Sequence, residues 1–279
     1  MQQMEPLLKW VGSKRWIASE ISEIVSTHLD HSGTYIEPFA GSAAVFFAVN
    51  CKHSILSDTL APLIATYQDI RDRPNKVWSE LRAVGVNANT EVDYTDRRSR
   101  FNKLLIREKF GVEFTALFIY LNKAGFNGLW RQTKDGIFNV PFGKHKSIKL
   151  PTRSDLIIAS SKLQSTRLIP ITIPVDVFDI IRQSRAGDVI FADPPYFETF
   201  TGYDGLSSNS SEFHQRLAIE LWNASLRGTF VIAANNDTPE TRKWYSPFCK
   251  IKSIKRQQNI AGTKEGRKPW NQLIATTNP

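Results

Sequence analysis

The sequence contains few residues of the kinds that crosslink a chain or hold a metal. Of its 279 residues only two are cysteines, Cys51 and Cys249, and they stand far apart. We therefore expect no disulfide framework, and the scarcity of cysteine favours a reducing cytoplasm. The five histidines show neither H-x-x-H nor Cys/His ligand spacing, so we expect no metal site.

Long apolar segments are also missing. The N-terminal segment from Met1 to Trp10 lacks the apolar core of a secretory signal, and no run approaches the ~20 apolar residues of a membrane helix. Hydrophobic residues make up 41% of the chain and charged residues 23%, which is typical of a packed globular protein. These features predict a cytoplasmic protein without a membrane partner, and we expect it to be a monomer in solution.

Positive charge lies in two blocks along the chain. The formal net charge is +9; residues 61–150 contribute +7 and residues 250–279 contribute +6, while the remaining two segments are each slightly acidic. Such blocks suit a polyanion like nucleic acid, because each neutralised phosphate releases counterions. A solvated basic surface is the alternative, and charge alone does not decide between them.

The order of apolar segments predicts an α/β sheet. Residues 34–39 are typical of a strand, followed by a small-residue turn at Gly41, a helix over 44–49 and a strand over 53–58. This order, with an acid at the end of the second strand, is that of a dinucleotide-type βαβ unit. Alternation returns after Pro151. Further strands are predicted at 167–173, 188–193 and 229–234, helices at 154–164, 177–182 and 211–226, and a terminal hairpin within 251–276.

The middle of the chain has a different character. Its segments with helical periodicity and many basic residues are 74–84, 94–110 and 113–123. A region punctuated by glycine and asparagine follows, up to Lys149. We therefore predict a doubly wound, Rossmann-like α/β domain formed by residues 1–60 and 151–279, with a mostly helical insertion over residues 61–150.

Three acids fall at the C-terminal ends of predicted strands. They are Glu37, Asp58 and Asp193. Ligands of open α/β sheets bind beyond the C-terminal ends of the strands. The sequence therefore predicts that these three acids converge at one edge of the sheet.

The sharpest motif is Asp193-Pro194-Pro195-Tyr196, directly after a predicted strand. The amine of a nucleobase is a poor nucleophile, because its lone pair is delocalised into the ring. The Asp193 carboxylate and the Pro194 carbonyl are two acceptors that favour a tetrahedral, reactive amine, and consecutive prolines stiffen the backbone between them. Tyr196 is suited to stack on a flipped base. A purely structural Asp-Pro-Pro turn is the alternative to amine methylation.

A second motif surrounds Gly41. Glycine permits a tight turn with close ligand approach, and N–H groups at the start of the next helix suit the methionine carboxylate of a methyl donor. Asp58 follows at the end of the next strand, where its carboxylate is placed to accept hydrogen bonds from ribose hydroxyls. Alternatively, Asp58 caps a helix that starts near Leu60.

A third motif, Leu8-Lys-Trp-Val-Gly-Ser-Lys14, contains a Gly-Ser-Lys tripeptide. The upstream glycine of a phosphate-binding loop is absent, which disfavours kinase-like nucleotide use. Ser13 alternatively caps the following helix.

Together these motifs resemble the Dam-type family of DNA adenine-N6 methyltransferases, the alpha or D12 class. The resemblance rests on five ordered segments: L-K-W-V-G-S-K, Y-I-E-P-F-A-G-S-A-A-V, L-S-D58, N122-K-A-G-F-N-G-L-W-R131 with G136-I-F-N-V-P-F-G-K-H-K146, and D-P-P-Y. It implies S-adenosylmethionine as cofactor, double-stranded DNA as partner, transfer to N6 of adenine within GATC, and DNA recognition by the insertion. It also implies that no metal takes part.

The resemblance also implies a role for individual residues. Catalytic residues would be Asp193, Pro194, Pro195 and Tyr196. Cofactor-binding residues would be Trp10, Lys14, Glu37, Phe39, Gly41, Asp58 and Asp193. DNA-binding residues would be Phe126, Asn127, Leu129, Arg131, Asn139, Pro141, Lys144 and Lys146. Phe126 would wedge into the base stack, Arg131 would contact guanine through O6 and N7, and the two lysines would hold phosphates.

The chain departs from the family pattern at a few places. Ala43 replaces the second glycine of F-x-G-x-G, N-N-D-T-P at 235–239 differs from S-N-H-D-T, and residues 256–274 match loosely. D-P-P-Y alone allows two other activities, methylation of RNA or of the cytosine amine. A catalytically silent DNA-binding protein is the alternative from another class.

Overall fold

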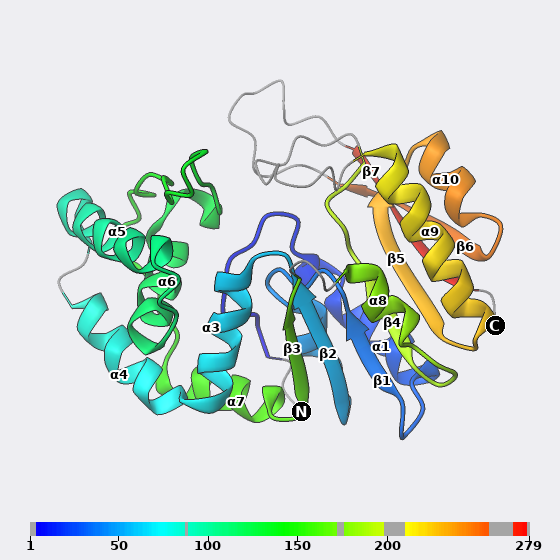
Figure 1. The fold of residues 1–279 in the computed structure, drawn as a ribbon, viewed down its shortest axis with the longest axis horizontal. Helices are drawn as coiled ribbons and strands as arrows, with labels where there is room; N and C mark the ends of the chain where they lie inside the picture. Colours follow the sequence, from blue (N-terminus) through cyan, green and yellow to red (C-terminus); the bar gives the residue numbers. More distant parts are fainter. Residues whose placement is uncertain (1–3, 87–88, 172–175, 198–209, 257–269, 278–279) are drawn as a thin grey trace. The chain divides into compact units, whose positions relative to one another are not determined.

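The computed structural model describes residues 4–86, 89–171, 176–197, 210–256 and 270–277 (Figure 1). Its strands form one sheet in the order β3-β2-β1-β4-β5-β7-β6. The strands are β1 (Thr34–Glu37), β2 (His53–Asp58), β3 (Thr166–Pro170), β4 (Val189–Ala192), β5 (Phe230–Asn236), β6 (Cys249–Arg256) and β7 (Trp270–Thr277). Strand β1 pairs in parallel with β2 and β4, and β4 with β5, whereas β7 is antiparallel to β5 and β6.

The predicted Rossmann-like α/β class is confirmed, including the terminal antiparallel pair. Helices alternate with the strands on either side of a long helical stretch. They are α1 (Ala18–His28), α2 (Ala44–Ala48), α3 (Ala61–Asp72), α4 (Pro74–Gly85), α5 (Glu91–Ile106), α6 (Val112–Ala124), α7 (Arg153–Leu163), α8 (Val177–Arg182), α9 (Ser211–Leu226) and α10 (Pro239–Tyr245), with the 3-10 turns η1 (Lys14–Trp16) and η2 (Phe126–Gly128). None of the helices in the described part of the chain has both the length and the apolar character needed to cross a bilayer.

The chain forms two compact units, and each is described by itself. Unit 1 comprises residues 1–22, 41–49 and 58–170, and unit 2 comprises residues 23–40, 50–57 and 171–279. The predicted division at residues 60 and 150 stays a prediction. The predicted strand 167–173 ends at Pro170 in the structure, and its last two positions lie outside the described residues.

Unit 2 contains the buried strands that carry the D-P-P-Y motif. All four residues of β4 are buried, which is typical of a parallel strand covered on both faces. Asp188, just before β4, accepts hydrogen bonds from the backbone N–H groups of Thr34 (2.7 Å) and Arg185 (3.0 Å). This carboxylate fixes the start of β4 against the start of β1, so the position of the residues after β4 is set by the sheet.

Unit 1 has an aromatic core formed by side chains of α5, α6 and the segment that follows η2. The rings of Phe101, Phe114, Phe118, Trp130 and Phe138 contact one another, with centroid separations from 4.7 to 6.2 Å. All five are buried. Aromatic pairs add about 0.5–1.5 kcal/mol each beyond the area that they bury. Many of the phenylalanines in this chain therefore stabilise the helical unit rather than forming an exposed stacking surface.

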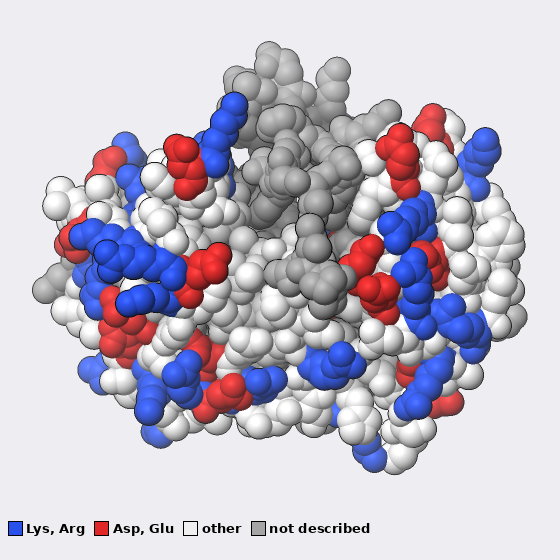
Figure 2. Space-filling view, in the orientation of Figure 1, with Lys and Arg blue, Asp and Glu red and all other residues white. Residues whose placement is uncertain are grey.

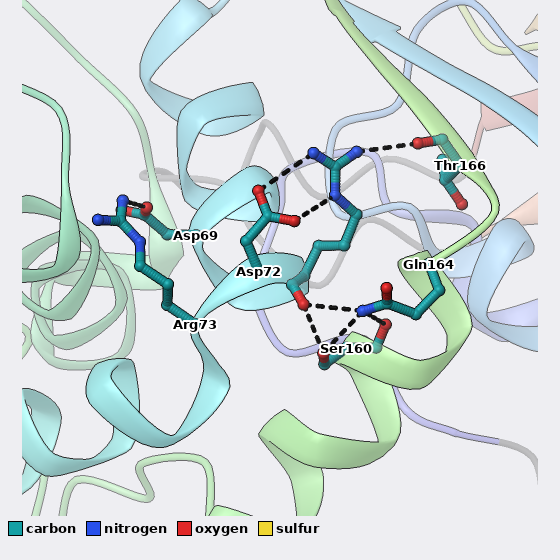
Figure 3. A network of polar contacts seen from close by, with 7 residues as sticks. Asp69, Asp72, Arg73, Ser160, Gln164 and Thr166 are labelled. Carbon is teal, nitrogen blue, oxygen red and sulfur yellow. Dashed lines mark hydrogen bonds and ion pairs between the residues drawn. The ribbon is translucent and has the colours of Figure 1, made fainter.

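A polar network joins α3 to the segment that follows the helical stretch (Figure 3). The backbone carbonyl of Arg71 accepts hydrogen bonds from Ser160 Oγ (2.6 Å) and Gln164 Nε2 (2.9 Å), both at the end of α7. The Arg71 guanidinium binds Asp72 and donates to the carbonyl of Thr166 (3.1 Å). These bonds explain why α7 and β3 pack with α3 in unit 1.

Candidate functional site

Each of the three predicted acids stands at the end of a parallel strand. Glu37 is the last residue of β1, Asp58 is the last residue of β2, and Asp193 follows β4 directly. Because β1 pairs in parallel with both β2 and β4, the three acids follow strands that point the same way. This is where open α/β sheets bind their ligands.

Glu37 is buried and bound to a neighbour on its own strand. It is 3% exposed, and the hydroxyl of fully buried Tyr35 donates to Glu37 Oε2 at 2.9 Å. Burial raises the pKa of Tyr35, and the negative charges of Glu37 and, more weakly, Asp193 raise it further. Tyr35 therefore keeps its proton and acts as a fixed donor to Glu37.

The D-P-P-Y turn is held by side chains of unit 2. Asp193 is half-buried and Pro194 is buried. Tyr196 is 9% exposed, and its hydroxyl is bound by Nε2 of Gln272 on β7. A tyrosine held in this way presents a fixed ring, which suits stacking on a base better than a mobile side chain does.

Phe197, the residue after the motif, is bound to β5 through both its backbone N–H and its backbone carbonyl. The N–H of Phe197 donates to Asn235 Oδ1 (3.2 Å), and its carbonyl accepts from Asn236 Nδ2 (2.7 Å). The two prolines already restrict the turn. These two asparagines, in the segment that departs from S-N-H-D-T, complete the restraint.

Behind this turn lies a buried histidine. His214 of α9 is 0% exposed, and its Nδ1 lies 3.2 Å from Nδ2 of Asn235. An asparagine Nδ2 is a donor, so Nδ1 of the imidazole is the acceptor. Burial lowers the pKa of His214 to about 4, and the carbonyl of Pro195 partly opposes that shift. The imidazole is therefore neutral at physiological pH.

We predict that His214 makes the stability of the protein depend on pH. Its pKa is lower in the folded chain (about 4) than the reference value of 6.5, so only the unfolded chain gains a proton as the pH falls below 6.5. The contribution is complete above pH 6.5 and is lost between pH 6.5 and 4, a loss of about 3 kcal/mol. Urea unfolding between pH 7 and 5 should show a flatter dependence for His214→Gln. Equal slopes for both proteins would contradict this role.

In unit 1 the predicted cofactor turn is fixed at Gly41. Its N–H donates to Asp58 Oδ2 (2.9 Å), and its carbonyl accepts from the hydroxyl of Tyr67 (2.8 Å). The φ angle of Gly41 is +47°, and a Cβ at this position would lie 2.8 Å from Cδ1 of Trp10. The Trp10 indole therefore packs directly on the glycine, and no other residue type fits.

Asp58 serves both the turn and the next helix. Besides the bond to Gly41, its Oδ1 accepts the N–H of Leu60 at 2.9 Å. The bond to Leu60 places Asp58 at the entry to α3, close to the role that the cap interpretation gives it, whereas ribose binding by Asp58 stays a prediction. Burial raises the pKa of Asp58 and the backbone N–H groups oppose this shift. A carboxylate offers about four lone-pair sites, so capacity remains for ribose hydroxyls.

The N-terminal motif folds onto the same turn. Lys14 is 3% exposed, and its Nζ donates to the carbonyl of Gly12 at 2.7 Å. Ser13 makes no capping hydrogen bond to η1; its Oγ instead lies 2.9 Å from Oγ of Ser42. The cap interpretation of Ser13 is thus wrong, because the hydroxyl connects the motif to the Gly41 turn. Ala43 adopts a left-handed conformation (φ 51°), which explains the glycine of the family pattern.

Phe126, the predicted wedge, is 46% exposed and therefore does not belong to the packed core of the unit. Its N–H donates to the carbonyl of Pro141 (3.0 Å), which joins the two predicted DNA-binding segments. Asn127 and Gly128 both have positive φ angles, and a Cβ at Gly128 would lie 2.3 Å from Cβ of Lys9. The loop is therefore held tightly at its base while it displays a large apolar ring.

The other predicted DNA-binding residues of unit 1 differ in exposure. Arg131, Pro141, Lys144 and Lys146 are exposed, whereas Asn127, Leu129 and Asn139 are half-buried. Figure 2 shows Lys and Arg side chains beside Asp and Glu over the helices. For example, Arg100 binds Glu113 and Glu80. Arg131, Lys144 and Lys146 form no ion pair with a described residue, which leaves their charge available for a polyanion.

Two anchoring residues of unit 1 were not predicted from the sequence. Asn122 accepts the N–H of Lys9 and donates to its carbonyl, both at 2.8 Å, and so joins the N-terminal motif to the loop predicted to bind DNA. Asn102 makes the same two-sided pairing with the backbone of Phe138, at 2.9 and 3.0 Å. Asn122 lies within a quoted motif and could have been considered, whereas nothing in the helical sequence around Asn102 indicates a partner 36 residues away.

Comparison with known proteins identifies one family. The family model described as D12 class N6 adenine-specific DNA methyltransferase matches residues 10–260. The retron Ec67 DNA adenine methylase of Escherichia coli is 32% identical over 281 aligned positions, covering 98% of this chain and 92% of that protein. A DNA adenine methylase of Vibrio cholerae is 29% identical over 100% of this chain and 98% of its own length. The type II methyltransferase M1.LlaDCHI of Lactococcus lactis is 27% identical over 98% and 95%.

The family match includes Trp10, the Gly41 turn, Asp58, the segments predicted to bind DNA and the D-P-P-Y motif in one continuous range. The resemblance found in the sequence motifs is thereby confirmed, and so is the assignment as an adenine-specific DNA-modifying enzyme. The chain is a member of the D12 class of N6 adenine-specific DNA methyltransferases.

Proposed function

We propose that this methyltransferase transfers the methyl group of S-adenosylmethionine to N6 of adenine in double-stranded DNA, within the sequence GATC. The observation that carries the proposal is the D-P-P-Y turn directly after buried β4, fixed by Gln272 and Asn235. No covalent enzyme intermediate and no metal is required, because the methyl group passes directly from sulfonium to nitrogen. Positioning then supplies most of the rate. Action in the cytoplasm and as a monomer stays a prediction.

Contacts around Gly41 in unit 1 support the proposed cofactor. The Trp10 indole packs on Gly41, and Asp58 retains acceptor capacity for ribose hydroxyls. Ala43, at the start of α2, has no side chain that could occupy the N–H groups of the first turn. Lys14, Glu37 and Phe39 are assigned to the cofactor by resemblance. When bound, S-adenosylmethionine supplies an electrophilic methyl group on sulfur.

Unit 2 offers the acceptors that the amine requires. Asp193 Oδ and the Pro194 carbonyl would each accept a hydrogen bond from one N–H of the adenine amine. The amine nitrogen would then become tetrahedral, and its lone pair would no longer be delocalised into the ring. Tyr196 would stack on the flipped base, and its fixed hydroxyl keeps the ring in place. The proton that the amine loses on methylation would pass along its hydrogen bond to the Asp193 carboxylate and from there to solvent.

The guanine contact by Arg131 leads to a further prediction. Arg131→Ala should relax sequence preference at one base pair and cost about 1–3 kcal/mol of binding free energy to the target sequence. Methyl-transfer rates on duplexes that carry every substitution at each target position would measure this. An unchanged order of preference across all duplexes would contradict the assignment.

The GATC assignment can be tested directly in cells. The chain is expressed in a host that lacks adenine methylation, and the methylated sites of its genome are mapped at single-base resolution. We expect methylated adenine at GATC and at few other sequences. A different motif would overturn the specificity, and methylcytosine or methylated RNA without methyladenine in DNA would overturn the acceptor.

A further inference from the structure

Arg131 is exposed, yet its guanidinium is held in one orientation by a single neighbour. Its Nε donates to Oδ1 of Asn139 at 2.7 Å, and its Nη2 donates to the backbone carbonyl of Asn139 at 3.0 Å. The N–H of Asn139 returns a third bond to the carbonyl of Arg131 at 3.1 Å. An exposed arginine ordinarily samples many rotamers, so this pairing restricts it strongly.

The two guanidinium bonds use only one edge of the planar group. Arginine has five N–H donors. Asn139 occupies the Nε–H and one N–H of Nη2, which lie on the same side. The three remaining N–H groups, two on Nη1 and one on Nη2, form no hydrogen bond with a described residue. They make up the outer fork of the group, whose spacing matches O6 and N7 of guanine in the major groove.

Asn139 itself is fixed by the hairpin that carries it. Residues 131–139 pair across a turn in which Thr133 accepts the N–H of Gly136 (3.0 Å) and donates its own N–H to Ile137 (2.8 Å). Phe138, which directly precedes Asn139, is 2% exposed and packs in the aromatic core against Trp130. Packing of Phe138 in the core of unit 1 therefore fixes Asn139, and Asn139 in turn fixes the orientation of the Arg131 guanidinium.

We infer that Asn139 is a positioning residue for base recognition, which holds the guanidinium of Arg131 from the side so that its outer fork faces guanine. The inference rests on the proposed function, in which Arg131 contacts guanine. It differs from the resemblance, which assigns Asn139 to direct contact with DNA. The two roles predict different responses to substitution.

The test measures equilibrium binding of the full chain to fluorescent duplexes at fixed salt. One duplex carries the target sequence, and the others replace its guanine pairs one at a time. Asn139→Ala should lower the preference for guanine at the position read by Arg131 about tenfold, and should have no such effect in an Arg131→Ala background. Asn139→Asp keeps an acceptor for Arg131 Nε and should retain the preference, while its charge weakens binding to all duplexes equally.

A control separates this role from general softening of the hairpin. Thr133→Ala removes the bond from the N–H of Ile137 (3.2 Å) and leaves both bonds to Arg131 intact, so base preference should stay unchanged. An equal loss for Thr133→Ala and Asn139→Ala would overturn the inference, as would an Asn139→Ala effect that persists in the Arg131→Ala background. If Arg131→Ala itself leaves the preference unchanged, the guanine contact of the proposed function fails instead.

Discussion

Asp193→Ala is expected to abolish measurable methyl transfer while DNA affinity stays close to that of the unaltered protein. Removing one preorganised group that meets developing charge typically costs about 10²–10³-fold in rate. Asp193 is also one of only two proposed acceptors for the amine, so the loss should lie at the upper end. The substitution should leave the sheet unaffected, because Asp193 follows buried β4, whose backbone is held by pairing with β1 and β5.

The matched control is an acid of unit 2 on another element, the helix α8. Asp179 of α8 pairs with Arg182 near the protein surface, and Asp179→Ala should retain a normal rate. Single-turnover methylation and fluorescence anisotropy with the same duplex separate the chemical step from binding. Near-normal turnover of Asp193→Ala would refute the catalytic assignment. Loss of DNA binding in parallel with turnover would show that the residue acts through structure.

Gly41→Ala should lower the affinity for S-adenosylmethionine by at least about tenfold. The added methyl would approach Cδ1 of Trp10 to 2.8 Å, on a backbone with φ +47°. Overpacking of this kind costs about 1–3 kcal/mol, and a left-handed alanine adds about 1–2 kcal/mol. The indole has to move off the turn, and the surface proposed to meet the cofactor moves with it. Isothermal titration calorimetry with the full chain measures the change.

Gly136→Ala is the control for the backbone conformation alone. Gly136 also has a positive φ (+76°), but its Cβ would meet nothing nearer than Nε2 of Gln132, at 4.0 Å. We expect a smaller loss of thermal stability in Gly136→Ala, which has the left-handed backbone without the overpacking, and reduced cofactor affinity only in Gly41→Ala. Equal cofactor affinities would show that the Trp10–Gly41 contact does not shape the cofactor site.

Much of the fold could be predicted because it depends on local pattern. The buried run before Asp193 and the acid at the end of the strand at 53–58 indicated parallel strands, and both strands are present. Helix α9 has the bounds that its periodicity predicted. These signals arise from neighbours within a few residues, which a sequence displays directly.

Boundaries were less predictable where a cap was overlooked. The helix predicted over 94–110 covers Glu91–Ile106, because the side chain of Thr90 accepts the N–H of Asp93 and starts the helix earlier. It ends before Glu108, which has a left-handed backbone (φ 50°). The loosely matched stretch 256–274 includes residues 257–269, which lie outside the described residues.

The supports of the site depend on distant pairs and could not be predicted. Gln272 binds Tyr196 across 76 positions of sequence, and Asn139 binds Arg131 through a hairpin whose turn residues are ordinary. For a single polar residue on a strand or helix, the neighbouring sequence does not indicate which distant residue it will hydrogen-bond. The sequence therefore indicates which residues perform the chemistry, whereas the structure shows which residues hold them.

The most direct test is a crystal structure of the chain with a GATC duplex and a cofactor analogue that has no transferable methyl group. We predict a flipped adenine whose N6 lies within hydrogen-bond distance, roughly 2.7–3.2 Å, of both Asp193 Oδ and the Pro194 carbonyl. The ring should stack on Tyr196. An adenine whose N6 meets neither oxygen, or one that stays in the duplex beside a bound analogue, would contradict this account.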